Sequence, residues 1–176
     1  MAVRRFPAAP WPSLLKASSA LVTVLLLGVA VAAYRAVPAA SGFTHYFGLG
    51  IAVVPALILI LSLLFTVTGY GVSSSSLAIQ RLLWITDIPL VGLRRVFAEP
   101  EICRGSIRLI GNAGLFSFTG LYRSARLGRY RLFATDFACA VVLECPHRTV
   151  VITPADPDSF VLHMQRAFPS AARGSA

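Results

Sequence analysis

Six arginines lie in the middle of the chain, in a segment that contains no acidic residue. No Asp or Glu occurs from Ile102 to Thr135, so no carboxylate close in sequence compensates these guanidinium charges. A positive charge near an anionic leaflet is worth about 1 kcal/mol, and its effect fades beyond a Debye length of about 8 Å. The segment therefore predicts contact with anionic lipid headgroups or an acidic protein surface. The alternatives are a solvated basic face and arginines bound to backbone carbonyls in a long loop. The six are Arg104, Arg108, Arg123, Arg126, Arg129 and Arg131.

Two aromatic residues, Phe116 and Phe118, lie between these arginines in the stretch GNAGLFSFTG, residues 111–120. A phosphate-binding P-loop needs Lys and then Ser or Thr after its second glycine. Here Leu115 follows Gly114 instead, which argues against nucleotide binding. We expect a loop whose two rings either insert into the membrane interface or a partner, or cover the mouth of a barrel.

The residues that usually perform catalysis or bind metals are few and poorly spaced. Cys103, Cys139 and Cys145 are odd in number, and with His147 they match no usual zinc pattern. The sequence offers no credible set of nucleophile, base and metal ligands. We therefore expect structural thiols, no metal, no cofactor and no enzymatic activity. Aromatic residues alternate with Arg as in single-strand binders, but membrane tethering and the scarcity of Lys argue against nucleic acid as a partner.

The composition is that of a membrane protein with one small domain. Among 176 residues, 56% are hydrophobic and only 13% are charged, and the mean hydropathy is +0.73. Soluble domains are about 25% charged. The net charge of +9 arises from fifteen Arg and the single Lys16 against seven acidic residues, which favours anionic lipid or an acidic protein as a partner.

Two uncharged apolar stretches, Ala17–Tyr34 and Gly48–Thr68, predict transmembrane helices. About 20 residues of helix cross a hydrocarbon core about 30 Å thick. We expect spans over residues 15–36 and 47–68, joined by a tight connection around Pro38. The two spans then form a helical hairpin.

The distribution of Lys and Arg around the spans predicts that both termini are cytoplasmic, because positive charges accumulate on that side. The protein is then a multi-pass protein of the cytoplasmic, or inner, membrane. A competing hypothesis treats Met1–Ala33 as a cleaved signal peptide. The flanking charges are Arg4, Arg5 and Lys16 before the first span, Arg35 between the spans, and Arg81, Arg94 and Arg95 after the second.

From Gly69 onward, short β-prone runs alternate with turn residues, and a single helix follows them. Asp156 suits a helix N-cap, Pro157 suits the first helical position, and apolar residues then recur at helical spacing before Pro169. About seven strands and one C-terminal helix is the order of a pleckstrin-homology-like (PH-like) β-barrel. The expected strands are Leu77–Arg81, Leu83–Ile88, Val96–Ala98, Ser106–Ile110, Tyr130–Ala134, Ala138–Glu144 and Thr149–Ile152.

The run RGSIRLIGNAGLFSFTGLYRSARLGRYRLFATD, followed by AVVL and RTVVITPADPDSF, resembles the bacterial PH-like domain of small membrane-anchored proteins. The resemblance covers about Tyr70 to Arg166, and its most specific part is Arg104 to Asp136. It implies a PH-like split barrel and membrane attachment. It implies no established catalytic residues.

These observations predict an α+β protein with two N-terminal transmembrane helices followed by a PH-like β-barrel with a C-terminal capping helix. The expected parts are a tail and hairpin over residues 1–69, a cytoplasmic domain over residues 70–168 and a disordered tail over residues 169–176. The expected function is a non-catalytic interaction module that contacts anionic headgroups or an acidic protein at the inner leaflet, with the six arginines, Phe116 and Phe118 as binding residues. The alternative is an accessory or regulatory subunit of a membrane enzyme or transporter, with a membrane-protein partner or a second copy of the chain.

Overall fold

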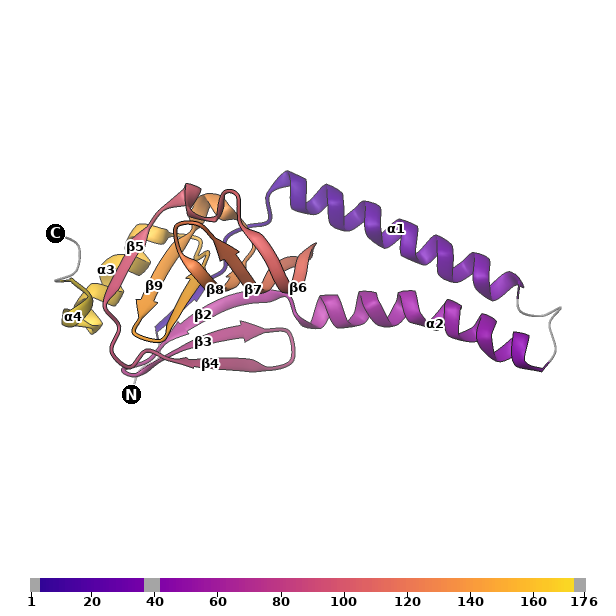
Figure 1. Ribbon diagram of the computed structural model, residues 1–176, viewed down its shortest axis with the longest axis horizontal. Helices are drawn as coiled ribbons and strands as arrows, with labels where there is room; N and C mark the ends of the chain where they lie inside the picture. The colour runs from indigo at the N-terminus through magenta and orange to yellow at the C-terminus, as the bar shows by residue number, and fades with distance from the viewer. Residues whose placement is uncertain (1–3, 37–41, 173–176) are drawn as a thin grey trace.

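Two long helices project side by side from one end of a β-sheet domain (Figure 1). The computed structural model describes residues 4–36 and 42–172, so the predicted connection around Pro38 lies outside the described residues. Helix α1 spans Ser13–Ala36 and helix α2 spans Phe43–Leu64. Both are long and apolar enough to cross a membrane, and most of their large apolar side chains are exposed. Exposed helices of this composition are suited to apolar surroundings.

Helix α2 is shorter than the predicted span to residue 68. It ends at Leu64 because strand β2 (Val67–Val72) begins almost at once. β-Branched Thr66 and its neighbours favour an extended backbone. The Thr66 hydroxyl donates a hydrogen bond to the Ser62 carbonyl oxygen at 3.4 Å and so closes the last helical turn.

The residues before α1 form a strand rather than the expected tail. Strand β1 (Arg4–Pro7) pairs antiparallel with β2, with Phe6 opposite Tyr70. Only 7% of Phe6 is exposed, and its ring packs edge-on against Phe160 at a centroid distance of 4.9 Å. The predicted boundary between residues 69 and 70 therefore falls inside β2. Chain segments on both sides of the helical hairpin belong to one sheet.

The first sheet has four antiparallel strands in the order β1-β2-β3-β4. Strand β3 spans Ser76–Arg81 and β4 spans Ile85–Pro89. The turn between them carries Leu82 and Leu83, which are 53% and 73% exposed. This apolar turn lies on the side of the domain from which the helices project (Figure 1).

The second sheet has six strands in the order β5-β9-β10-β8-β7-β6. All neighbouring strands are antiparallel except β10 and β8, which are parallel. The 3₁₀ helices η2 (Pro100–Cys103) and η3 (Phe137–Cys139) contribute to a second apolar cluster on its outer face. The strands are β5 (Arg95–Ala98), β6 (Ile107–Leu115), β7 (Ser117–Ser124), β8 (Gly128–Ala134), β9 (Val141–Cys145) and β10 (Arg148–Ile152).

The two sheets pack face to face, and helix α3 (Pro157–Ala167) completes the core between them. The prediction of this helix is confirmed, since the Asp156 carboxylate accepts a hydrogen bond from the Ser159 amide at 3.0 Å as an N-cap. The expected tail begins instead with a short helix, α4 (Pro169–Ala172), whose Ala171 is 1% exposed. Residues 173–176 lie outside the described residues.

The two apolar helices, the β-sheet domain and the C-terminal helix agree with the predicted PH-like order, but the strand number and the closure of the sheets differ. The described residues form ten strands, and they make two separate sheets that do not close on each other. The three strands that the sequence analysis missed are β1, β2 and β7. Two of these carry glycines and one carries a proline, residues that weaken a strand pattern.

Replacing Phe6 by Ala tests the role of β1. Truncation of a buried phenylalanine costs about 3–5 kcal/mol, so Phe6→Ala is expected to lower the unfolding midpoint of the full chain in mild detergent, followed by tryptophan fluorescence. The control is Leu162→Ala on α3, whose side chain is 53% exposed. An unchanged midpoint for Phe6→Ala would show that β1 does not support the domain.

A buried tyrosine joins the two sheets. The Tyr70 hydroxyl donates to the Phe133 carbonyl oxygen at 2.7 Å and accepts from the Thr153 amide at 3.1 Å. Burial raises the pKa of Tyr70 to about 12, although the hydrogen bonds with Thr153 oppose this effect. In the unfolded chain a tyrosine ionises near pH 10. The unfolded state therefore loses its proton first, and the stability that Tyr70 contributes below pH 10 is lost as the pH rises to about 12.

The Tyr70→Phe variant tests this linkage. Two pH units of difference correspond to about 2–3 kcal/mol, so the wild-type free energy of unfolding is expected to fall by that much more between pH 10 and pH 12 than that of the variant. The variant is also expected to be less stable at neutral pH, because the Thr153 amide loses its acceptor. Parallel pH profiles for both proteins in chemical unfolding would contradict this assignment.

Candidate functional site

The β6–β7 hairpin lies beside the ends of both long helices (Figure 1), and hydrogen bonds join it to each of them. On the α1 side, the Ser19 hydroxyl donates to the Gly114 carbonyl oxygen at 3.4 Å and accepts from the Phe116 amide at 3.0 Å. On the α2 side, the Ser117 hydroxyl donates to the Phe65 carbonyl oxygen at 3.4 Å. The tip of this hairpin therefore lies where the helices meet the domain.

Residues 111–120 form most of this hairpin, so the expectation of a loop is wrong. Gly111 and Gly120 face each other across the two strands, with φ angles of 127° and 146°. A Cβ atom on Gly120 would lie 2.1 Å from the Ile110 carbonyl oxygen. The glycines that suggested a loop are needed here because the two backbones approach so closely.

Phe116 and Phe118 both pack against aromatic rings of the protein. The Phe116 ring lies 5.9 Å from that of Trp11, centroid to centroid, and Phe118 lies 4.6 Å from Phe137. Phe118 also belongs to the margin of the outer apolar cluster. Both side chains are half-buried, and Phe118 covers protein surface rather than projecting freely from the domain.

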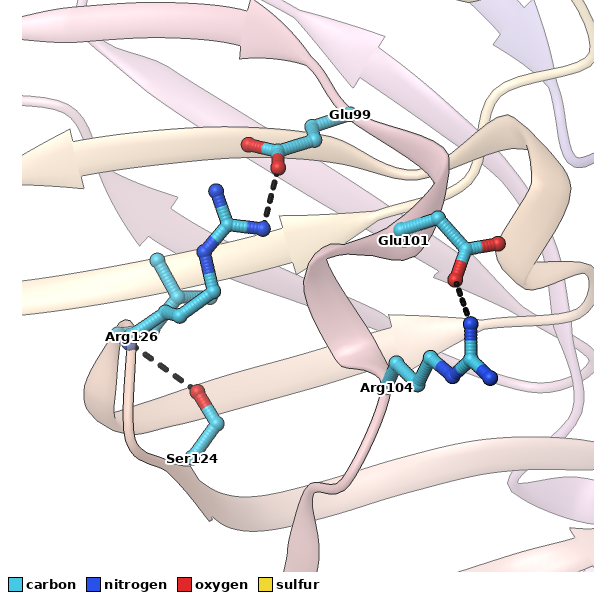
Figure 2. A network of polar contacts seen from close by, with 6 residues as sticks. Glu99, Glu101, Arg104, Ser124 and Arg126 are labelled. Carbon is cyan, nitrogen blue, oxygen red and sulfur yellow. Dashed lines mark hydrogen bonds and ion pairs between the residues drawn. The ribbon is translucent and has the colours of Figure 1, made fainter.

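Two of the six predicted arginines have acidic partners. Arg104 pairs with Glu101 at 3.2 Å, and Arg126 pairs with Glu99 at 2.5 Å (Figure 2). The pairs are largely exposed, and exposed ion pairs contribute about 0–1 kcal/mol to stability. The two ion pairs matter more for binding than for stability, because each carboxylate neutralises an arginine charge that has no acidic neighbour within the acid-free segment. Both glutamates lie just before the acid-free segment.

The register of β7 and β8 places three other arginines on one face of the six-stranded sheet. Arg123 lies opposite Arg129, and Leu121 lies opposite Arg131. Phe133, two residues beyond Arg131, is part of the core between the sheets, so these side chains share its face. Among the described residues, no ion pair involves any of the three, and we call them the inner-face arginines.

Arg108, the remaining predicted arginine, lies apart from the inner-face arginines. It is paired in register with Tyr122, which belongs to the outer cluster, and its guanidinium donates to the Gly111 carbonyl oxygen at 3.3 Å. The structure therefore divides the predicted set into two ion-paired arginines, one arginine bound to backbone and three on a common face.

An open pocket of about 570 Å³ lies between the end of α2 and the inner face of β6, β7 and β8. Arg131 and Arg81 both line this pocket, together with apolar side chains that include Leu61 and Phe65. Sequence reasoning had considered Arg81 only as a charge after the second span. The sequence carries no clear signal for this role, because Arg81 and Trp84 lie at the β3–β4 turn, two strands after the end of α2 at Leu64.

The thiols show no sign of activation. Burial raises the pKa of Cys103, Cys139 and Cys145 above the ordinary value, which keeps these thiols protonated at neutral pH. All three cysteines are free. Within residues 4–36 and 42–172, no group of three or more His, Cys, Asp or Glu side chains is arranged to hold a metal ion.

The chain matches the family described as the bacterial PH domain over residues 68–167. This match covers more than half of the chain, so the protein belongs to the bacterial PH domain family. The resemblance seen in the sequence is thereby confirmed. Comparisons with curated proteins and with solved structures found no match.

The close approach of β6 and β7 can be tested at Gly120. Gly120→Ala is expected to be more destabilising than Gly105→Ala in the same unfolding assay, because Gly105 also has a positive φ angle of 70° but has open space where a Cβ would lie. Strain at a positive φ alone costs about 1–2 kcal/mol. Equal losses in the two variants would contradict the steric role of Gly120.

Proposed function

We propose that the protein is a membrane-anchored, non-catalytic interaction module whose PH domain contacts anionic lipid headgroups at the inner leaflet. The observation that carries this proposal is the pairing of β1 with β2 directly at the base of the helical hairpin. A domain whose strands precede α1 and follow α2 has little freedom to leave the surface from which the helices emerge.

The same pairing supports a topology in which the chain crosses the membrane and returns. Strands β1 and β2 lie in one sheet, so both ends of a spanning hairpin must be on one side of the membrane. The domain side carries Arg4, Arg5 and Lys16, whereas the far end of α1 carries Arg35. By the positive-inside rule the domain side is cytoplasmic.

The inner-face arginines are well placed for headgroup contact in this topology. Arg131 lines the pocket at the end of α2. Arg129 is two residues earlier on β8, about 7 Å away at 3.3 Å per residue, and Arg123 lies opposite it. Arg129 therefore lies within a Debye length of about 8 Å of Arg131. Each charge that reaches an anionic leaflet is worth about 1 kcal/mol of attraction.

The full chain, reconstituted into phosphatidylcholine bilayers, provides the test. Spin-labelled phosphatidylglycerol is expected to be enriched over spin-labelled phosphatidylcholine at the protein surface, with an enrichment that falls as salt rises. The double variant Arg123→Gln, Arg129→Gln is expected to lose most of this enrichment. The matched control is Arg104→Gln, Arg126→Gln, which removes the same charge from arginines that already pair with glutamates.

Equal losses in the two double variants, or an enrichment that does not depend on salt, would reject headgroup contact by the inner-face arginines.

The second candidate function, an accessory subunit of a membrane complex, is favoured by one observation. Ile107 and Ile110 on the edge strand β6 are 69% and 72% exposed, and exposed apolar edge strands are typical of protein contacts. Absence of any headgroup preference would favour this alternative.

A further inference from the structure

Arg81 is held in the pocket at the end of α2 by aromatic rings. Its guanidinium carbon lies 4.9 Å from the ring centroid of Phe65, 5.5 Å from that of Phe133 and 5.6 Å from that of Trp84. Such contacts attract a cation and fix its position. They do not neutralise its charge.

Arg81 also has an unused hydrogen-bond donor. Its Nε atom is buried and has no hydrogen-bond partner among the described residues. Buried polar groups in native proteins are nearly always hydrogen-bonded, so an unpaired guanidinium nitrogen inside a pocket indicates a missing acceptor. Neither Arg81 nor Arg131 forms an ion pair within the described part of the chain.

Electrostatics in the pocket also favour an anion. Burial lowers the pKa of Arg81, and the nearby positive charge of Arg131 lowers it further. Both effects destabilise the guanidinium charge, and an anion between the two arginines would relieve both. Arginine is the side chain best suited to this task, because its planar donors match the oxygens of a phosphate group.

The remaining walls of the pocket are largely apolar. Leu61 and Phe65 at the end of α2, with Leu121 and Phe133 on the sheet, contribute much of this lining. The volume of about 570 Å³ is within the range of about 300–1,000 Å³ that is usual for small-molecule sites. A free phosphate would leave these walls in contact with water, whereas an acyl chain would cover them.

We propose that this pocket binds one anionic amphiphile, with its phosphate held by Arg81 and Arg131 and its acyl chain lying along the end of α2. The inference rests on the proposed function because membrane anchoring brings the pocket to the leaflet that supplies the amphiphile. The exposed turn residues Leu82 and Leu83 follow Arg81 directly in the sequence, and an exposed apolar turn is suited to contact with the same leaflet.

A second hollow of about 660 Å³ lies at the start of α1 and serves as a comparison. It is lined by Leu14, Leu115 and Phe118 but also by Asp136. An acidic side chain repels a phosphate. Charge therefore assigns the anionic amphiphile to the pocket with Arg81 and Arg131, even though the second hollow is also lined largely by apolar side chains.

The test uses the delipidated full chain in mild detergent, titrated with phosphatidylglycerol or phosphatidylcholine of the same acyl chains and followed by native mass spectrometry. One phosphatidylglycerol per chain is expected to bind about tenfold more tightly than phosphatidylcholine. Arg131→Gln is expected to weaken phosphatidylglycerol binding about tenfold. Leu121→Trp, which fills the pocket and keeps both charges, is expected to weaken it as well.

The matched control is Arg148→Gln on β10, which removes the same charge from an exposed arginine that does not line the pocket and is expected to leave the affinity unchanged. Each variant must keep the wild-type unfolding midpoint for its result to count. Wild-type affinity in both Arg131→Gln and Leu121→Trp would overturn the proposal. Displacement of the lipid by an equal concentration of inorganic phosphate would also overturn it, since the site would then recognise the anion without a chain.

This experiment separates the inference from the proposed function. The surface enrichment described above depends on Arg123 and Arg129, whereas the single bound lipid depends on Arg81 and Arg131. Loss of enrichment in the Arg123 and Arg129 double variant with retention of one bound lipid would leave the pocket assignment intact. Enrichment in bilayers without a tightly bound lipid would reject the pocket alone.

Discussion

The pairing of β1 with β2 brings the two ends of the helical hairpin into one sheet, and the positions of the other elements follow from it. Phe6 on β1 reaches the core and contacts Phe160 on α3, so the first residues of the chain and the C-terminal helix stabilise each other. The β6–β7 hairpin then fits between the ends of the helices, where Ser19 and Phe65 bond to it. The β-sheet domain and the helical hairpin are therefore packed together as one structure, and no flexible linker separates them in the described part of the chain.

Those parts of the fold that depend on local signals could be predicted from the sequence. The C-terminal helix has a strong N-cap, Asp156, followed by Pro157 and by apolar residues at helical spacing, all within one short segment. Both long helices were predicted because their composition alone is decisive. Strand β1 was missed because its four residues show no alternation of apolar and polar side chains. It is a strand because it pairs with β2, which lies far away in the sequence. Likewise the glycines of residues 111–120 suggest a loop, whereas Gly111 and Gly120 are required by the close approach of β6 and β7.

The sequence shows where charged residues lie along the chain, but it does not show which of them pair in the folded protein, and this limited the prediction of the candidate site. The acid-free segment contains the inner-face arginines, but Glu99 and Glu101, just outside it, pair with Arg126 and Arg104. Arg81 was outside the segment, and only the packing of two sheets against α2 brings it to the same pocket as Arg131. The distances that decide whether a charge is compensated belong to the tertiary structure.

The register of β1 has a consequence for the order of events during biosynthesis. Arg4 pairs with Val72, so the first strand leaves the ribosome 68 residues before its partner does. At about 5–20 residues per second, β1 waits about 3–14 seconds. Both apolar helices are made within that interval. The sheet to which both ends of the helical hairpin belong can therefore close only after both helices have been synthesised.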